Sequence, residues 1–141
     1  SNGVRQITSG QDNEVWSFGE DNYEILKKYL FIRERLRPYI RKTMDECSEN
    51  GSPVMRPVFY DFYNDKVAWN IEDEYMFGSD ILVAPIMEEG ARERTVYLPE
   101  GEKWTDAYTK RTYDGGQYVT VPAPIEIIPV FTRSNAKVDI Y

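Results

Sequence analysis

Residues 71–85 read Ile-Glu-Asp-Glu-Tyr-Met-Phe-Gly-Ser-Asp-Ile-Leu-Val-Ala-Pro, and this stretch decides the fold class of the chain. Residues 81–86, which begin within this stretch, are apolar on both faces, and such a run is typical of a short strand buried inside a sheet. Gly78 lies just before this strand, at a position that we interpret as a turn. Short strands separated by turns continue to the end of the chain, which predicts an antiparallel β-sandwich.

Strand signals elsewhere differ in strength. Residues 54–62 alternate loosely between apolar and polar, and Pro57 within them indicates a strand at the edge of a sheet, because proline cannot donate to a ladder. We expect a short helical turn within residues 66–75. The remaining strands are expected at residues 95–98, 104–108, 110–113, 118–121 and 127–133.

The first third of the chain has the period of a helix. We expect the helix to begin near Asp21, which forms a capping box with Glu24, and to end at Asn50-Gly51. Because a proline inside a helix costs about 3 kcal/mol, Pro38 predicts a kink or a second helix. An apolar stripe contains Ile25, Leu26, Tyr29, Leu30, Ile32 and Leu36, and continues with Tyr39, Ile40, Met44 and Cys47. The predicted class is α+β, with N-terminal helices followed by an antiparallel, Greek-key-like β-sandwich.

The composition excludes several classes of site and partner. The 141 residues include no histidine, which excludes a Ser-His-Asp triad, a Cys-His pair and a His-ligated zinc within this chain. The net charge of −7 argues against nucleic acid, since an acidic chain repels phosphates. The apolar runs are far shorter than the roughly 20 residues of a membrane span. The single cysteine, Cys47, cannot form an internal disulfide, which favours a cytoplasmic location without deciding it.

Acidic and aromatic residues each allow two interpretations. The densest acidic region could hold an acid/base pair, but turn and strand-end residues facing solvent are favoured, with Asp73 or Asp80 capping a local turn. This region contains Asp61, Asp65, Glu72, Asp73, Glu74 and Asp80. The aromatic residues could stack on sugars, but cross-strand packing is favoured. They are Trp69, Trp104, Tyr108, Tyr113 and Tyr118.

Two single residues also stand out. Arg56 either pairs with a carboxylate that ties the sandwich to the helix or is a plain surface arginine. Cys47 lies on the helical stripe, where we expect a small buried hydrophobic residue.

Seven blocks in order along the chain resemble glycoside hydrolase family 31, the family of α-glucosidases and α-xylosidases. They are residues 14–19 (Glu-Val-Trp-Ser-Phe-Gly), 35–40 (Arg-Leu-Arg-Pro-Tyr-Ile), 53–57 (Pro-Val-Met-Arg-Pro), 75–85, 96–99 with Gly101 and Trp104, 115–116 and 128–131. The resemblance implies that residues 1–52 are the loop and helical segment ending a (β/α)8 barrel. It implies that residues 53–141 are the β-sandwich domain that follows.

The resemblance also implies retaining hydrolysis of α-linked glucosides or xylosides, which needs two carboxyl groups about 5–5.5 Å apart. In the family both are barrel aspartates; we find neither motif here and expect both upstream of Ser1. We therefore expect no catalytic residue, metal or cofactor in this chain and no activity from the chain alone. Its expected partners are the rest of the parent enzyme, the parent's α-linked glycoside substrate and, through the helical stripe, a second copy of itself.

The first twenty residues carry the substrate-adjacent candidates. By resemblance, Trp16 and Phe18 follow the last barrel strand, where they either form an aromatic wall near the substrate or pack against the barrel helix. The family's Arg-x-His-Gly has no match: either Ile7 stands in place of the histidine, or Gly3 follows a histidine that is absent. The second placement is favoured because Ser1-Asn2 resembles a remnant of tag removal. The alternative function is a non-catalytic carbohydrate-binding or protein-interaction β-sandwich module.

Overall fold

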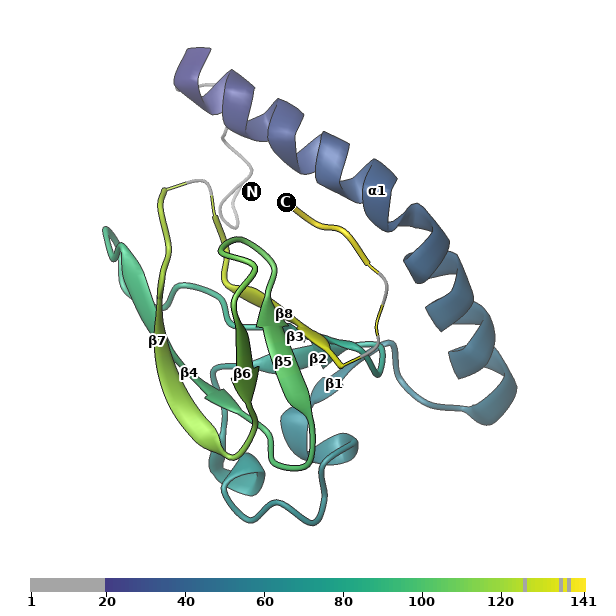
Figure 1. The fold of residues 1–141 in the computed structure, drawn as a ribbon. Coiled ribbons are helices and arrows are strands. Elements are labelled where there is room, and N and C mark those ends of the chain that lie inside the picture. The colour runs from purple at the N-terminus through teal and green to yellow at the C-terminus, as the bar shows by residue number, and fades with distance from the viewer. Residues whose placement is uncertain (1–19, 126, 135, 137) are drawn as a thin grey trace. The chain divides into compact units, whose positions relative to one another are not determined.

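The computed structural model describes residues 20–141 except 126, 135 and 137 (Figure 1). One α-helix is followed by short antiparallel strands, which confirms the predicted α+β class and the β-sandwich. The chain divides into two units, Ser1–Arg37 and Pro38–Tyr141, and the second contains all of the described strands. No helix in the described part of the chain is both long and apolar enough for a membrane span.

The helix α1 runs from Glu20 to Asn50 without interruption at Pro38. Of the two alternatives for Pro38, the second helix is therefore wrong, because a helix of 31 residues retains its other backbone hydrogen bonds around the single one that proline removes. The kink stays a prediction. The predicted end is confirmed: Gly51 has a φ of +78° and its amide donates to the carbonyl of Cys47 at 2.8 Å.

Part of the expected apolar stripe, namely Ile25, Leu26 and Tyr29, lies outside the described side chains. The expected capping pair, Asp21 and Glu24, lies outside them as well. Self-association through this stripe therefore stays a prediction.

Two antiparallel sheets enclose the core. The larger has the order β1-β2-β3-β8-β5-β6, and the smaller pairs β4 with β7. The strands are β1 Met55–Pro57, β2 Tyr75–Phe77, β3 Ile81–Val83, β4 Glu93–Leu98, β5 Lys103–Asp106, β6 Thr112–Asp114, β7 Gln117–Pro122 and β8 Val130–Arg133. The last strand, β8, lies between β3 and β5, so the end of the chain completes the larger sheet.

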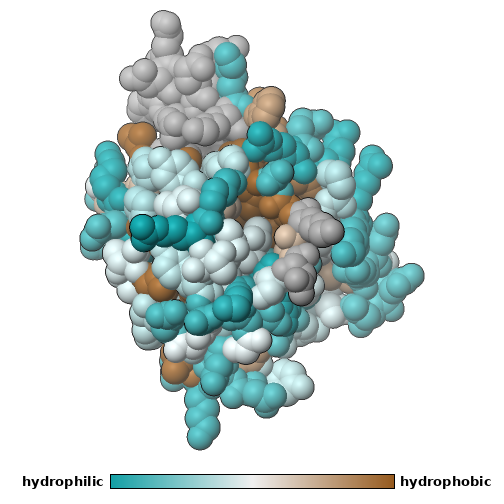
Figure 2. All heavy atoms as spheres, viewed as in Figure 1, coloured by the Kyte–Doolittle hydropathy of each residue, from teal (hydrophilic) through white to brown (hydrophobic). Residues whose placement is uncertain are grey.

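The core draws on both sheets. Trp104 of β5 is its largest fully buried side chain, and its indole N–H donates to the carbonyl of Pro99 at 3.0 Å. Further buried members come from the larger sheet, from β4 and β7, and from the helical turns: Val58, Phe62, Met76, Leu82, Val96, Leu98, Val121 and Phe131. The molecular face in Figure 2 is largely teal and white, with brown hydrophobic patches among the hydrophilic side chains.

The segment after β1 departs from the expected strand. β1 is at the sheet edge, as Pro57 predicted, but the chain then forms the 3-10 helix η2, Val58–Tyr60. Val58 at the start of this helix and Phe62, two residues beyond its end, are both buried in the core. The expected helical turn within residues 66–75 is confirmed as the 3-10 helix η3, Ala68–Asn70.

Candidate functional site at the junction of helix and sheet

The last part of α1 presents three buried side chains at four-residue spacing. They are Tyr39, Thr43 and Cys47, and this confirms that Cys47 is buried. Met44 is 56% exposed, so the expectation that it continues the apolar face is wrong. Thr43 lies on the buried face instead, at 4% exposure. Its four-residue spacing from Tyr39 and Cys47 could have predicted this burial, whereas its hydropathy could not.

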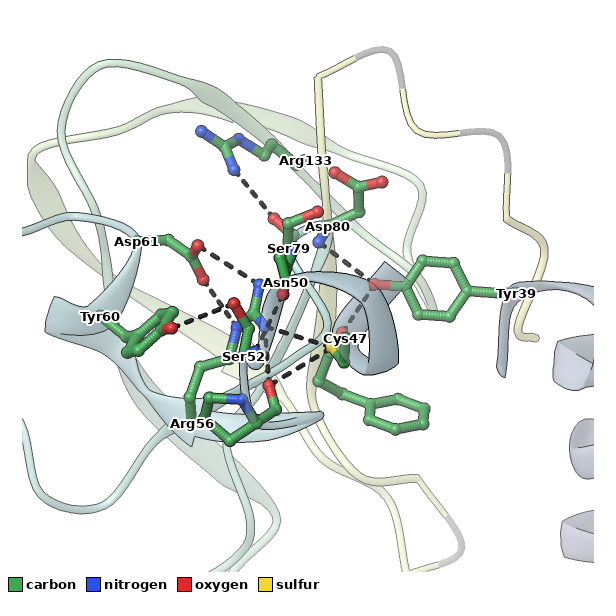
Figure 3. A network of polar contacts seen from close by, with 12 residues as sticks. Tyr39, Cys47, Asn50, Ser52, Arg56, Tyr60, Asp61, Ser79, Asp80 and Arg133 are labelled. Carbon is green, nitrogen blue, oxygen red and sulfur yellow. Dashed lines mark hydrogen bonds and ion pairs between the residues drawn. The ribbon is translucent and has the colours of Figure 1, made fainter. Parts of the chain in front are cut away.

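Tyr39 holds the turn between β2 and β3 against the helix. Its hydroxyl donates to the carbonyl of Phe77 at 2.7 Å and accepts from the amide of Asp80 at 3.2 Å, as Figure 3 shows for Asp80. The Tyr39 and Phe77 rings also meet edge to face, with centroids 5.9 Å apart. Burial raises the pKa of Tyr39, so the phenol keeps its proton for this bond.

Gly78 lies at the centre of this turn. Its φ is +66°, and a Cβ there would overlap the Tyr39 hydroxyl and lie 3.0 Å from the Thr43 side chain. The close approach of α1 to the β2–β3 turn therefore depends on glycine at this position.

Arg56 of β1 forms the second part of the junction (Figure 3). Its Nε and Nη2 donate to the two carboxylate oxygens of Asp61 at 2.9 and 3.3 Å, and its Nη1 donates to the carbonyl of Pro53 at 2.7 Å. Nη1 also lies 3.8 Å from the Cys47 sulfur on α1. Because the residue is buried, the surface-arginine interpretation is wrong and the pairing with a carboxylate is confirmed. The contact with the helix, however, is made by Arg56 itself at Cys47, since Asp61 belongs to the segment after β1.

A second polar network joins the two sheets through Tyr97 of β4. Its hydroxyl donates to Asp65 Oδ2 at 2.7 Å, and its backbone amide donates to Glu74 Oε1 at 2.7 Å. Asp65 also accepts from the amides of Glu100 and Val67 at 2.9 and 3.0 Å. Asp65 and Glu74 are each 5% exposed, so the solvent-facing interpretation is wrong for these two acidic residues. Asp65 also caps the turn that leads into η3, through the amides of Val67 and Ala68. Asp73, one of the two expected capping residues, forms an ion pair with Arg94.

The pKa values of Glu74 and Asp65 shift in opposite directions. Burial raises the pKa of Glu74 to about 7. Burial acts in the same direction on Asp65, but hydrogen bonds from Glu100, Tyr97, Ala68 and Val67 outweigh it and lower the pKa of that carboxyl.

This pair does not have the arrangement of a glycosidase. Two catalytic carboxyl groups must face a sugar held between them, whereas Asp65 and Glu74 both bind Tyr97. Both oxygens of Asp65 already accept internal donors. We therefore interpret the pair as structural.

The titration of Glu74 predicts a pH-dependent stability. A carboxyl with a raised pKa binds its proton more tightly in the folded state, so its contribution is greatest below about pH 4.5 and is lost as the pH rises through about 7. A rise from 4.5 to about 7 corresponds to about 3 kcal/mol. Urea unfolding between these pH values should give a falling stability for the wild type and a much flatter profile for Glu74→Gln.

The exposed residue Glu88 provides the control for this measurement. Glu88→Gln should retain the wild-type profile. Asp65 acts in the opposite direction, because its lowered pKa gives stability that is lost as the pH falls. Both the wild type and Glu74→Gln contain Asp65, so its contribution cancels when the two stability profiles are subtracted. Parallel profiles for wild type and Glu74→Gln would show that Glu74 does not titrate in this range.

The aromatic candidates do not form one row on a sheet face. Trp104 is buried in the core, Tyr113 packs against Phe131, and Tyr118 packs against Tyr97 with centroids 5.0 Å apart. Trp69 of η3 stacks on Phe59 at 4.2 Å. Cross-strand packing is confirmed for Tyr118, which faces Tyr97 across β7 and β4. Trp69 instead packs between two helical turns, and Tyr108 meets Tyr141 edge to face.

The substrate-adjacent candidates Trp16 and Phe18 lie outside the described residues, as does Ile7. Among the residues that are described, no group of three or more acidic or cysteine side chains is placed to hold a metal ion.

Comparison with known proteins extends these observations. Residues 51–137 match the family model of the glycosyl hydrolase family 31 C-terminal domain. The chain is 36% identical over 125 residues to alpha-glucosidase 2 of Bacillus thermoamyloliquefaciens, covering 89% of this chain and 16% of that protein. It is 37% identical over 136 residues to the sulfoquinovosidase of Escherichia coli K12, covering 95% and 20% respectively.

A solved structure agrees with this fold. The crystal structure of a family 31 alpha-xylosidase from a soil metagenome, complexed with xylose, superposes with a TM-score of 0.84 at 54% identity, covering 90% of this chain and 19% of that chain. This chain therefore spans about a fifth or less of the length of these relatives. With a family model matched over more than half of its residues, the chain belongs to glycosyl hydrolase family 31.

Proposed function

We propose that this chain is a structural part of a retaining α-glycosidase and is inactive alone. The observation that supports this most is the match of residues 51–137 to the C-terminal domain of the family, in a chain that covers a fifth or less of its relatives. The buried carboxyl groups of Asp65, Glu74 and Asp106 agree with it, because each accepts internal hydrogen bonds. The catalytic aspartates then belong to a part of the parent outside this chain.

We also propose that the two parts of the chain have different roles. Residues 1–52 complete the catalytic barrel, where Trp16 and Phe18 lie close to the substrate pocket. Residues 53–141 form the sandwich that supports it. The contacts of Tyr39 and Arg56 provide the physical link, since they join the last turns of α1 to β1 and to the β2–β3 turn.

The proposed substrates of the parent are α-linked xylosides and glucosides. The relative with 54% identity is an alpha-xylosidase bound to xylose, which favours an α-xyloside as the first substrate to test. Hydrolysis would proceed by double displacement with retention of configuration.

A paired assay tests this function. Turnover of an aryl α-xyloside and an aryl α-glucoside is measured for the 141-residue chain and for the longer natural polypeptide that contains it. We expect turnover from the longer polypeptide alone. A longer polypeptide that is folded but leaves both glycosides intact would contradict the proposed substrate class.

A further inference from the structure

An open cavity of about 510 Å³ lies beside the sandwich and adjoins the helix junction at Asp61, the partner of Arg56. Three segments meet there: the loop between η2 and η3, the turn between β4 and β5, and the end of β8. Its volume is within the 300–1,000 Å³ that is usual for small-molecule sites.

Asp65 fixes the two loops at this cavity relative to each other. Its carboxylate accepts from the amide of Val67 on the first loop and from the amide of Glu100 on the second. Trp69 adds rigidity, because its indole N–H donates to the backbone carbonyl of Tyr63 at 2.8 Å. The cavity wall is therefore preorganised, which lowers the entropic cost of binding.

Unused hydrogen-bonding groups gather at the same wall. In the described part of the chain, the side chains of Tyr63, Asn64 and Glu100 make no hydrogen bond or ion pair, and all three line the cavity. Arg133, which also lines the cavity, is held in place by Glu102 at 3.2 Å and by the carbonyl of Ser79 at 2.9 Å. The lining thus offers one exposed aromatic ring, an amide, a carboxylate and a fixed guanidinium.

The charge of the cavity restricts the ligand class. Four carboxylates and a single arginine line it, so phosphates and other anions are disfavoured. A neutral polyhydroxyl ligand suits the remaining groups, since amide and carboxylate bind hydroxyls and an aromatic ring covers the apolar face of a sugar.

We propose that this cavity is an accessory binding site for a short, neutral, α-linked oligosaccharide. The choice of α-linked sugars rests on the proposed function of the parent enzyme. Tyr63 supplies the stacking surface, and Asn64 and Glu100 bind the hydroxyls.

The test is a titration of the ¹⁵N-labelled 141-residue chain with maltotriose, followed by NMR. We expect millimolar affinity with shift changes confined to residues 61–65 and 100–102. Tyr63→Ala should weaken binding by about tenfold, the loss expected for one aromatic contact. Asn64→Ala is a second variant that leaves the ring in place and should also weaken binding.

Tyr108→Ala is the matched control, because Tyr108 is also an exposed tyrosine, at 41% against 66% for Tyr63, and does not line the cavity. It should bind like the wild type. Absence of binding, shift changes elsewhere, an equal loss in Tyr108→Ala, or equal binding of cellotriose would each overturn the proposal. The titration requires no catalysis, so its failure is distinguishable from failure of the turnover assay.

Discussion

Replacing Arg56 with methionine is expected to lower the free energy of unfolding by about 3 kcal/mol. The substitution keeps an apolar stem of similar length but removes the guanidinium that neutralises Asp61 and satisfies the carbonyl of Pro53. The side chains of Arg56 and Asp61 are only 6% and 19% exposed, so water replaces the lost partner poorly. Urea unfolding at neutral pH measures the difference.

An exposed ion pair of the same chain provides the control for Arg56→Met. Lys103 and Asp114 lie 2.7 Å apart, but their side chains are 67% and 76% exposed. Lys103→Met should cost about 0–1 kcal/mol. The double variant Arg56→Met/Asp61→Leu should recover part of the loss, because it removes the unpaired carboxylate. If Arg56→Met and Lys103→Met cost the same, the buried pair does not stabilise the junction.

Replacing Gly78 with alanine should destabilise the chain by a similar amount, about 3 kcal/mol. A positive φ costs an L-residue about 1–2 kcal/mol, and the new methyl must also displace the Tyr39 hydroxyl from its place between Phe77 and Asp80. Overpacking of this kind adds about 1–3 kcal/mol. Urea unfolding again measures the effect.

Gly90→Ala separates the two causes. Gly90 has a φ of +81°, and a Cβ at this residue would have no neighbouring atom within 4 Å, so its substitution carries the backbone cost without the clash. We expect about 1–2 kcal/mol for Gly90→Ala. The double variant Gly78→Ala/Tyr39→Phe tests the clash directly, because it removes the overlapping hydroxyl. Equal losses for Gly78→Ala and Gly90→Ala would mean that α1 does not pack closely on the β2–β3 turn.

Features set by local chemistry could be predicted from the sequence. Pro57 predicted an edge strand, Gly51 the end of α1, and residues 81–86 a buried strand, observed as Ile81–Val83. Each of these depends on the conformational or hydrogen-bonding limits of one or a few residues. The family resemblance depends on blocks spread along the whole chain, and the family match at residues 51–137 confirms it.

Burial of polar residues could not be predicted in the same way. Asp65 and Glu74 are buried because Tyr97, which lies 32 and 23 residues away, donates to both. Hydropathy places such residues at the surface, where most acidic side chains lie. Thr43 was missed for the same reason, although its helical spacing gave a usable signal.

We propose that the carboxylates that cleave a glycosidic bond lie outside this chain. The initial rate at which the purified 141-residue chain hydrolyses an aryl α-xyloside, beside Asp65→Asn and Glu74→Gln, tests this proposal. We expect a rate equal to the protein-free blank for all three samples. Hydrolysis by the wild-type chain that disappears in either amide variant would contradict the proposal.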